Sequence, residues 1–325
     1  MLITDRIYGE IEITNPLIID LINSKPFQRL KHISQDGATH FLQPFRDVTR
    51  YEHCIGAWYL SAKFDRPIEE QIASLLHDIP HTAFSHVIDF VMEDKKHAYH
   101  DHFIKQVIIN SEIPEILERY TISLEKILDK SVFYLLNNNL PDISVDRWDY
   151  FMRDGFTNGL LPKETVELFL ESIYEKDERF YFTNTRIANL FTIMFMNCSR
   201  LLWLDPASHG ASFLLSNAIK IALTKKYIIK EDFFDTDDVL MQKLIDAKDY
   251  EIDALLKRLK PTTKFEYASK EESEFYGSNK PRFVDPWVLH EKKLVQLSEL
   301  TPGLEQYFTD FKNQHQNLGV KQITS

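Results

Sequence analysis

The sequence predicts a mostly α-helical protein that begins with a short β-hairpin and ends in a small region of mixed structure. Apolar residues recur at helical spacing through most of the chain, as Ile55, Trp58, Tyr59 and Ala62 do. A chain of 325 residues can bury a substantial core, and 44% hydrophobic with 27% charged residues is usual for a globular protein. We find no internal repeat and no low-complexity segment.

Local signals place the elements of the first half. Residues 1–14 alternate weakly around Tyr8-Gly9, as expected for a hairpin. Asn15-Pro16 opens a helix, because proline is favoured in a first turn, and Pro80 ends another, because it disfavours α geometry at the residue before it. After the hairpin we expect helices over 17–23 and 27–33, a loop over 36–48, helices over 51–64, 68–76 and 84–92, a polar loop over 94–102 and a helix over 103–109.

The second half is also predicted to be mainly helical. Its clearest alternation of polar and apolar residues, over 178–184, predicts a short strand. We expect helices over 116–136, around Asp146, and over 163–174, 186–204, 212–227 and 236–246, followed by a second strand over 282–289. The chain is predicted to form a core over 1–230 and a C-terminal appendix over 231–325 that packs on it.

Charge and composition exclude several classes of partner. The net charge of −11 argues against a broad nucleic-acid-binding surface but permits a local basic pocket. Two cysteines, Cys54 and Cys198, cannot form a disulfide framework, which is typical of a reducing cytoplasm. The N-terminus lacks the pattern of a signal peptide, and the most apolar window, 187–196, is too short to cross a bilayer. We therefore expect a cytoplasmic protein with no membrane span and no nucleic-acid partner.

Histidine and aspartate side chains gather at the end of the apolar segment 68–76. His77 and Asp78 are adjacent there, and two further histidines follow within nine residues. His53 lies upstream and Asp146 downstream. Imidazole and carboxylate together suit Fe, Mn, Zn, Co or Ni, so this set predicts a site for one divalent transition metal.

The order H…HD…D resembles the HD superfamily of metal-dependent phosphohydrolases. Local sequences place the resemblance in the branch that contains the dNTP triphosphohydrolases. They are Ile7-Tyr8-Gly9-Glu10-Ile11, Pro26-Phe27-Gln28-Arg29-Leu30-Lys31, Arg50-Tyr51-Glu52-His53, Leu76-His77-Asp78, Phe84-Ser85-His86 and the segment 146–154. The resemblance implies a single helical HD-domain core, with His53, His77, Asp78 and Asp146 as the metal ligands. Such a metal keeps positions open for water and a phosphate oxygen.

The resemblance also implies roles for other residues. His86 is placed near the leaving oxygen, with Asp89 three residues on to hold its imidazole. Histidine suits proton transfer near neutral pH. The remaining expected catalytic residues are His81 and His100, and the expected substrate contacts are Gln35, Arg50, Arg147, Tyr150 and Asp154. His97 and His102 have no counterpart and are expected to be solvated loop residues.

The chain differs from the dNTP-cleaving relatives at the position that contacts the outer phosphate groups of the substrate. Relatives carry an arginine in the helix after the aspartate motif, where this chain has Asn197. Arg200, one helical turn away, is the candidate replacement. The resemblance therefore supports phosphoester hydrolysis more strongly than it supports triphosphate as the product.

We expect a metal-dependent phosphohydrolase acting on a nucleotide or another small phosphorylated substrate. The leading reaction is hydrolysis of a dNTP to deoxynucleoside and triphosphate by metal-activated water, with Mg²⁺ accompanying the phosphates as a further cofactor. One alternative is a nucleotidase or phosphomonoesterase, and another is a non-catalytic nucleotide sensor. An oxygenase of the HD type would need a second metal, for which His81, His86 and His100 are the available ligands. The resemblance also suggests a homo-oligomer.

Overall fold

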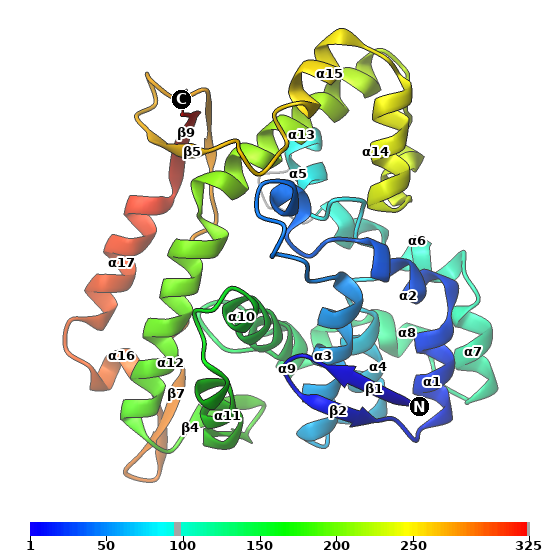
Figure 1. Ribbon diagram of the computed structural model, residues 1–325. Helices are drawn as coiled ribbons and strands as arrows, with labels where there is room; N and C mark the ends of the chain where they lie inside the picture. Colours follow the sequence, from blue (N-terminus) through cyan, green and yellow to red (C-terminus); the bar gives the residue numbers. More distant parts are fainter. Residues whose placement is uncertain (94–98, 324–325) are drawn as a thin grey trace.

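The structure is a computed structural model that describes residues 1–93 and 99–323. Helices dominate it, and the described strands form three small sheets near the edges of the molecule (Figure 1). The α-helices are α1 (Pro16–Asn23), α2 (Lys25–Arg29), α3 (Arg50–Lys63), α4 (Ile68–Leu76), α5 (Val87–Met92), α6 (Ile104–Ile109), α7 (Ile113–Arg119), α8 (Leu124–Leu128), α9 (Tyr134–Asn137), α10 (Val145–Thr157), α11 (Lys163–Ser172), α12 (Thr185–Cys198), α13 (Pro206–Thr224), α14 (Asp237–Asp246), α15 (Tyr250–Leu256), α16 (Leu297–Leu300) and α17 (Leu304–His315). The predicted mostly α fold with an N-terminal hairpin and a small C-terminal region of mixed structure is confirmed.

Short 3₁₀ segments and strands complete the fold. The 3₁₀ segments are η1 (Leu30–His32), η2 (Gly37–Phe41), η3 (Tyr99–Phe103), η4 (Lys130–Val132) and η6 (Lys230–Phe234), and η5 (Ser199–Trp203) is π-helical. The strands are β1 (Leu2–Asp5), β2 (Gly9–Glu12), β3 (Ile173–Lys176), β4 (Arg179–Phe182), β5 (Phe265–Ala268), β6 (Phe275–Ser278), β7 (Trp287–His290), β8 (Lys293–Gln296) and β9 (Asn317–Gln322). They pair as β1-β2, β3-β4-β7-β8 and β5-β9-β6.

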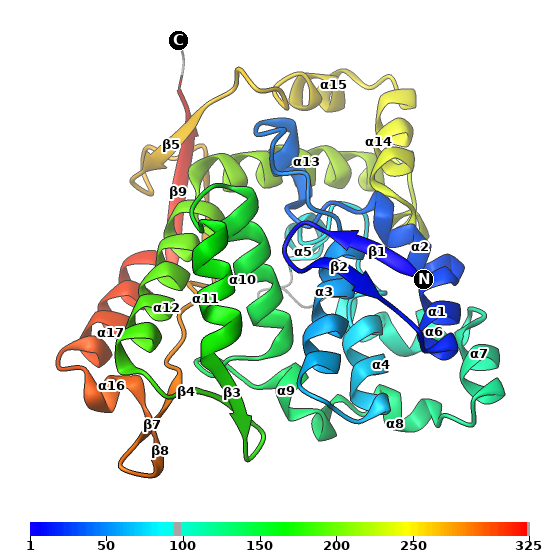
Figure 2. The ribbon, with the colours of Figure 1, turned by 60° about the horizontal axis from the view of Figure 1, so that its bottom comes forward.

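Helix α10 lies at the centre of the molecule, between α3 and α12 (Figure 1). Its Trp148 and Phe151 are fully buried in the larger apolar cluster, which also takes side chains from the hairpin, α1, α3, α4 and α12. A second cluster joins η2 and α5 to α13, α14 and β5. Figure 2 shows α13 crossing above the α10–α12 layer. The two clusters hold a rigid frame on which loops can position functional groups.

Capping residues fix the helices that carry the site. The Thr49 side chain accepts from the Glu52 backbone N–H and the Glu52 carboxylate accepts from that of Thr49, forming a capping box at the start of α3. The Ser144 side chain accepts from the Arg147 backbone N–H at the start of α10. Both helices therefore begin at a defined residue, and His53 and Asp146 lie within their first turns.

The turn before α5 differs from the prediction. A helix over 84–92 is wrong at its start, because Phe84 and Ser85 have φ values of 58° and 51° and α5 begins at Val87. The Asp237 carboxylate accepts hydrogen bonds from the Phe84 N–H at 2.6 Å and the Ser34 N–H at 2.8 Å. This contact with a distant aspartate stabilises a left-handed conformation that local sequence disfavours.

Other elements are shorter or additional. The helix expected over 116–136 is broken into α7, α8, η4 and α9, with Thr121 at φ 58° ending the first. The loop over 36–48 contains η2, and the strand over 282–289 is confined to β7. Residues 94–98 of the expected polar loop, including His97, lie outside the described residues, whereas His102 is exposed as predicted. Helices α15 and α17 and strands β3, β5, β6, β8 and β9 were not predicted.

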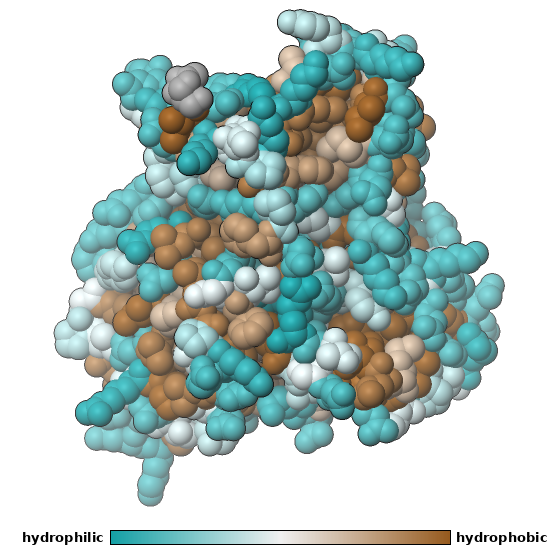
Figure 3. All heavy atoms as spheres, viewed as in Figure 1, coloured by the Kyte–Doolittle hydropathy of each residue, from teal (hydrophilic) through white to brown (hydrophobic). Residues whose placement is uncertain are grey.

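The C-terminal region is joined to the core by backbone pairing. β7 pairs in parallel with β4, with Tyr181 opposite Trp287, and the Ala83 N–H donates to the Phe233 carbonyl at 2.8 Å. The division at residue 230 stays a prediction. Figure 3 shows a mainly hydrophilic face with apolar atoms interspersed over α11 and α12, where Leu168, Leu190 and Ile193 are exposed.

No single helix in the described part of the chain is long and apolar enough to cross a membrane; only the bent pair 185–203 and 206–224 reaches that length and composition when taken together.

Candidate metal centre and substrate pocket

Three helices bring nitrogen and oxygen atoms to one point. His53 comes from the first turn of α3, His77 follows the last residue of α4, and Asp146 is in the first turn of α10. His53 Nε2 lies 3.2 Å from His77 Nε2 and 3.1 Å from Asp146 Oδ1. The Asp78 carboxylate is 3.5 Å from His77 Nε2 and 3.6 Å from His53 Nε2. The four predicted ligands are thus brought together, with Asp78 at slightly longer range.

The hydrogen bonds of the two histidines determine which nitrogen faces the centre. His77 Nδ1 donates to the Ser74 carbonyl at 2.8 Å, and His53 Nδ1 donates to Asp149 Oδ2 at 2.8 Å. Both partners are acceptors only, so each Nδ1 carries a hydrogen and each Nε2 is the nitrogen that faces the centre. Two imidazole nitrogens and a carboxylate that converge in this way can bind a cation together, so the donor set fits a divalent metal ion.

The same site holds positive charge even without a metal. Burial lowers the pKa of His53, but its hydrogen bonds with Asp146 and Asp149 and the charge of Asp78 outweigh this and raise it to about 10. Burial likewise opposes ionisation of Asp146, yet the two histidines hold its pKa well below the usual range. A proton or a metal ion therefore neutralises the same cluster of carboxylates.

Asp149 forms a supporting layer that was not predicted from the sequence. Its carboxylate accepts two hydrogen bonds from Arg153 at 2.9 Å and one from Tyr8 Oη at 2.7 Å, and all of these residues except Tyr8 are fully buried. Arg153 also pairs with Asp5 at 3.0 Å. The N-terminal hairpin therefore fixes the residue that orients His53. The i, i+3 spacing of Asp146 and Asp149 was the available signal.

Gly56 makes this layer possible. A Cβ at this position would lie 1.8 Å from Asp149 Oδ1 and 2.4 Å from Arg153 Nη2. Any side chain would displace the buried ion pair, so only glycine lets α3 and α10 approach this closely.

Arg50 links Asp78 to the turn before α5. Its Nη1 contacts Asp78 Oδ2 at 2.5 Å and its Nε donates to Ser85 Oγ at 3.0 Å, while Ser85 Oγ donates to the Ser34 carbonyl. Arg50 is buried, with only 4% of its surface exposed. Burial alone would raise the pKa of Asp78. The charges of His77, His81 and Arg50 nevertheless hold the pKa of this carboxyl well below its usual range. Asp78 is therefore ionised and fixed in place.

Three histidines line the cavity beside Asp78. The His81 and His100 rings stack with centroids 3.7 Å apart, and the His86 ring lies 5.2 Å from that of His81. His86 Nδ1 bonds to Asp89 Oδ2 at 2.8 Å, as the resemblance implied. Burial, Arg50 and His100 lower the pKa of His81 well below its usual value, so this imidazole is neutral. Ligand atoms of Asp78, His81 and His100 all lie within 4.8 Å of one another.

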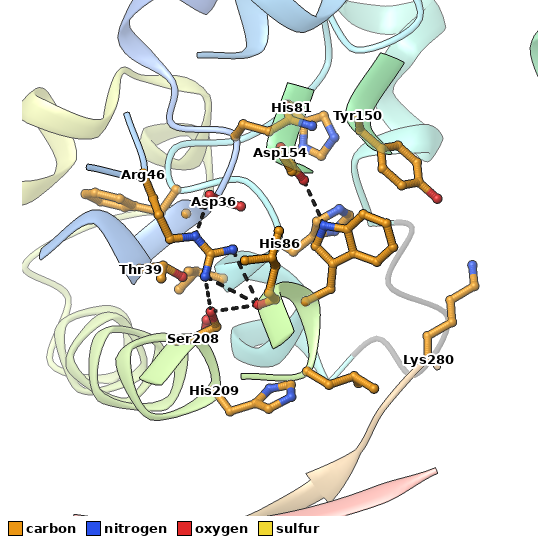
Figure 4. A pocket seen from close by; sticks show the side chains of 18 of the residues that line it. Asp36, Thr39, Arg46, His81, His86, Tyr150, Asp154, Ser208, His209 and Lys280 are labelled. Carbon is orange, nitrogen blue, oxygen red and sulfur yellow. Dashed lines mark hydrogen bonds and ion pairs between the residues drawn. The ribbon is translucent and has the colours of Figure 1, made fainter. Parts of the chain in front are cut away.

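A cavity of about 300 Å³ extends from the histidines along α10. Figure 4 shows Asp36 and Arg46 on the side of this pocket opposite Tyr150. Arg46 is 1% exposed and is held by Asp36 Oδ2 at 2.9 Å and Ser208 Oγ at 2.9 Å. Burying this arginine in a polar network gives the far end of the pocket a fixed shape.

Unpartnered polar atoms point to a ligand at that end. Trp203 Nε1 donates to Asp154 Oδ2 at 2.8 Å, whereas Asp154 Oδ1 and Gln35 Oε1 are buried and have no hydrogen-bond partner among the described residues. Burial and the charge of Asp36 raise the pKa of Asp154 to about 7. Buried acceptors without partners are costly unless a ligand donates to them.

Most of the predicted site residues meet at this pocket. The lining includes Gln35, Arg50, Asp78, His81, His86, His100, Asp146, Tyr150 and Asp154, with His53, His77 and Asp89 directly behind. Arg147 is different: it does not line the pocket, and its Nη1 donates to the Asn138 and Asp142 carbonyls at 3.1 and 2.5 Å. Its guanidinium caps the loop before α10 instead. Arg200 is exposed and also outside the lining.

Comparison with known proteins assigns the family. Residues 50–154 match the HD domain. The uncharacterized protein YdhJ of Bacillus subtilis is 35% identical over 299 residues, which cover 92% of this chain and 91% of that protein. The chain belongs to the HD-domain metal-dependent phosphohydrolases. The HD-domain protein is also 36% identical over 174 residues to the metal-dependent phosphohydrolase cns2 of Cordyceps militaris, covering 53% of this chain and 50% of that protein.

More distant relatives have named substrates. The HD-domain protein is 25% identical over 244 residues to the human deoxynucleoside triphosphate triphosphohydrolase SAMHD1, and the match covers 58% of this chain and 39% of the human protein. The chain thus spans half or less of the length of cns2 and SAMHD1. A crystal structure of a hypothetical protein from Aquifex aeolicus has the same fold, with a TM-score of 0.70, 19% identity, and coverage of 99% of this chain and 95% of that one.

Proposed function

We propose that this HD-domain phosphohydrolase acts on a nucleotide, with a dNTP converted to deoxynucleoside and triphosphate as the leading reaction. The observation that carries the proposal is the layout of α10. Asp146, Tyr150 and Asp154 follow one another at four-residue intervals and all line the pocket, so they lie on one helix face. A substrate with its phosphorus at Asp146 would lie beside this helix face, with its sugar at Asp154. The named activity of SAMHD1 supports this choice of substrate.

His53, His77, Asp78 and Asp146 are the proposed ligands of one divalent metal ion. Their imidazole and carboxylate donors suit Fe, Mn, Zn, Co or Ni, and Mg²⁺ would accompany the nucleotide phosphates. When bound, such an ion supplies an activated water and neutralises charge on the phosphate. The chain contributes Asp149, which fixes the orientation of His53, and Ser74, which fixes that of His77.

Arg50, His81 and His100 are proposed to bind the reacting phosphate, and His86 to protonate the leaving oxygen. Arg50 uses Nη1 for Asp78 and Nε for Ser85, and the remaining N–H groups of its guanidinium can donate to a phosphate oxygen. His86 is the proposed general acid. Its Nδ1 is bonded to Asp89, which fixes the ring orientation and leaves Nε2 to deliver a proton to the leaving oxygen. His81 and His100 contact the phosphate.

The far end of the pocket is proposed to recognise the sugar. Asp154 Oδ1 and Gln35 Oε1 are acceptors without a partner among the described residues, and a sugar hydroxyl can donate its single O–H to Asp154 Oδ1. Trp203 holds the other Asp154 oxygen at 2.8 Å and prevents it from rotating away. Location in the cytoplasm and self-association stay predictions.

Two other reactions are favoured by single observations. Neither Asn197 nor Arg200 lines the pocket, so the arginine that grips outer phosphates in relatives has no direct counterpart, which favours a nucleotidase or phosphomonoesterase. The close approach of Asp78, His81 and His100 is what an oxygenase with a second metal would need. The family assignment argues against a sensor without activity.

Product analysis tests the proposal. Metal-loaded protein is incubated with dNTPs, NTPs, nucleoside monophosphates and p-nitrophenyl phosphate, and the phosphate species are resolved by ion-exchange chromatography. We expect triphosphate from dNTPs and none from an Asp78→Ala control. Orthophosphate from monophosphates alone would replace the leading reaction by the nucleotidase, and oxygen-dependent turnover would replace it by the oxygenase.

A further inference from the structure

The pocket receives two basic side chains from a part of the chain far from the HD motif. Lys280 and Arg282 line it together with Arg50 and the histidines. Both belong to the extended segment 279–286, which leads from β6 to β7. Figure 4 shows the Lys280 side chain on the side of the pocket where Tyr150 lies. The C-terminal region therefore forms part of the pocket wall.

Backbone contacts hold Arg282 in place. Its N–H donates to Ser199 Oγ at 3.2 Å, at the start of the π-helical segment that also carries Trp203. Three residues later the Asp285 N–H donates to the Pro141 carbonyl at 3.0 Å. The segment is thus attached at Arg282 itself and three residues after it. A positioned arginine loses less conformational entropy when it binds a ligand.

The Arg282 guanidinium is held by aromatic rings and not by an acid. Its central carbon lies 5.1 Å from the Tyr150 ring centroid and 5.5 Å from that of Trp203. Among the described residues, no carboxylate oxygen lies within 4.0 Å of its nitrogen atoms. A cation–π contact orients the guanidinium but leaves its charge and its N–H donors available. In a chain with a net charge of −11, such a cation beside a phosphate pocket points to an anionic ligand.

The position of Arg282 matches the part of the substrate that Asn197 leaves without a partner. Tyr150, on whose ring Arg282 packs, lies with Lys280 on the side of the pocket opposite Asp36 and Arg46 (Figure 4). The sugar is proposed to bind at the Asp36 and Arg46 end, so the outer phosphates would lie on the side of Arg282. We propose that Arg282 binds the outer phosphate groups of the substrate and selects a triphosphate over a monophosphate. The inference rests on the proposed function, and it assigns to the C-terminal segment the contact that relatives make from the helix after the aspartate motif.

Binding of inorganic triphosphate tests this inference without turnover. Its dissociation constant is measured by calorimetry for metal-loaded wild type, Arg282→Gln, Arg282→Lys and Arg200→Gln, and that of orthophosphate and of a deoxynucleoside is measured beside it. Arg200 is the matched control because it is exposed and outside the pocket lining. Thermal unfolding of each variant checks that the fold is intact.

We expect Arg282→Gln to weaken triphosphate binding by about 10- to 100-fold. Orthophosphate and deoxynucleoside binding should change by less than about threefold, Arg282→Lys should recover part of the loss, and Arg200→Gln should resemble wild type. The inference is overturned if wild type does not bind triphosphate, if Arg282→Gln binds it normally, or if that variant loses all three ligands equally. Arg282-dependent triphosphate binding without dNTP hydrolysis would reject only the proposed function.

Discussion

His53 and Asp149 are joined by a hydrogen bond of 2.8 Å between Nδ1 and Oδ2, both fully buried. The bond fixes the imidazole so that its Nε2 faces His77 and Asp146. Asp149 is in turn held by Arg153 and by Tyr8 of the N-terminal hairpin. The metal centre therefore depends on a carboxylate that does not itself face the metal.

Replacing Asp149 by Asn should weaken metal binding. The amide lacks the charge that stabilises the His53 N–H and the Arg153 guanidinium, and loss of such a supporting partner costs about 10- to 100-fold in metal affinity. The measurement is a titration of chelator-stripped protein with Mn²⁺ or Co²⁺. Asp310→Asn, in an exposed part of α17, is the control, and equal affinities for a folded Asp149→Asn variant would contradict this role.

Gly56→Ala should destabilise the protein severely. The added methyl would lie 1.8 Å from Asp149 Oδ1, and forcing apart a buried ion pair costs about 3 kcal/mol or more. We expect a markedly lower Tm and little bound metal. Gly277→Ala is the matched substitution, because a Cβ there would meet only Phe213 Cζ at 3.3 Å. Similar Tm values for the two variants would show that α3 and α10 separate easily.

Asp237 should make stability depend on pH. Burial raises the pKa of this carboxyl from 3.8 to about 7. A carboxyl group whose pKa is higher in the folded protein favours folding while protonated, so its contribution is full below about pH 4 and is lost as the pH rises to about 7. Asp237→Asn mimics the protonated form. Relative to this variant, wild type should lose free energy of unfolding between pH 4 and 7, as measured by urea titrations. If the free energies of unfolding of the two proteins differ by the same amount at every pH, the raised pKa of Asp237 is refuted.

Asp154 should distinguish substrates by their sugar hydroxyl. If Asp154 Oδ1 accepts from that hydroxyl, Asp154→Asn should lower kcat/KM for a dNTP by about tenfold or more. The same substitution should hardly change kcat/KM for the 2′,3′-dideoxy analogue, and this kcat/KM serves as the internal control for folding. An equal loss for both substrates would assign Asp154 to structure and not to sugar recognition.

Residues at the centre of the candidate site were easier to predict from the sequence than those around it. His53, His77, Asp78, Asp146 and the cavity histidines were predicted because each lies in a short characteristic segment of sequence, and the structure brings them together. The hydrogen bond from His53 to Asp149 was not predicted, because it depends on packing between α3 and α10. That Arg282 lines the pocket could not be predicted, because it is more than a hundred residues from the motif and reaches the pocket only through the fold.

Errors in secondary structure have similar causes. The left-handed Phe84 and Ser85 depend on Asp237, about 150 residues away, so local propensity could not reveal them. The substrate contact predicted for Arg147 stays a prediction, because a match to relatives identifies the residue type but not the Asn138 carbonyl that the side chain bonds here. Helix α17 is a different case, since Leu304, Tyr307, Phe308 and Phe311 have helical spacing. That signal was present in the sequence and was overlooked.

Hydrolysis in ¹⁸O-labelled water tests the central claim most directly. Chelator-stripped protein is compared with protein reloaded with one equivalent of metal, and both products of a dNTP are analysed by mass spectrometry. If a bound metal ion supplies the water that attacks the phosphorus nearest the sugar, one ¹⁸O should appear in the triphosphate and none in the deoxynucleoside, and turnover should occur only after reloading. Full activity of the stripped protein, or label in the deoxynucleoside, would contradict the account.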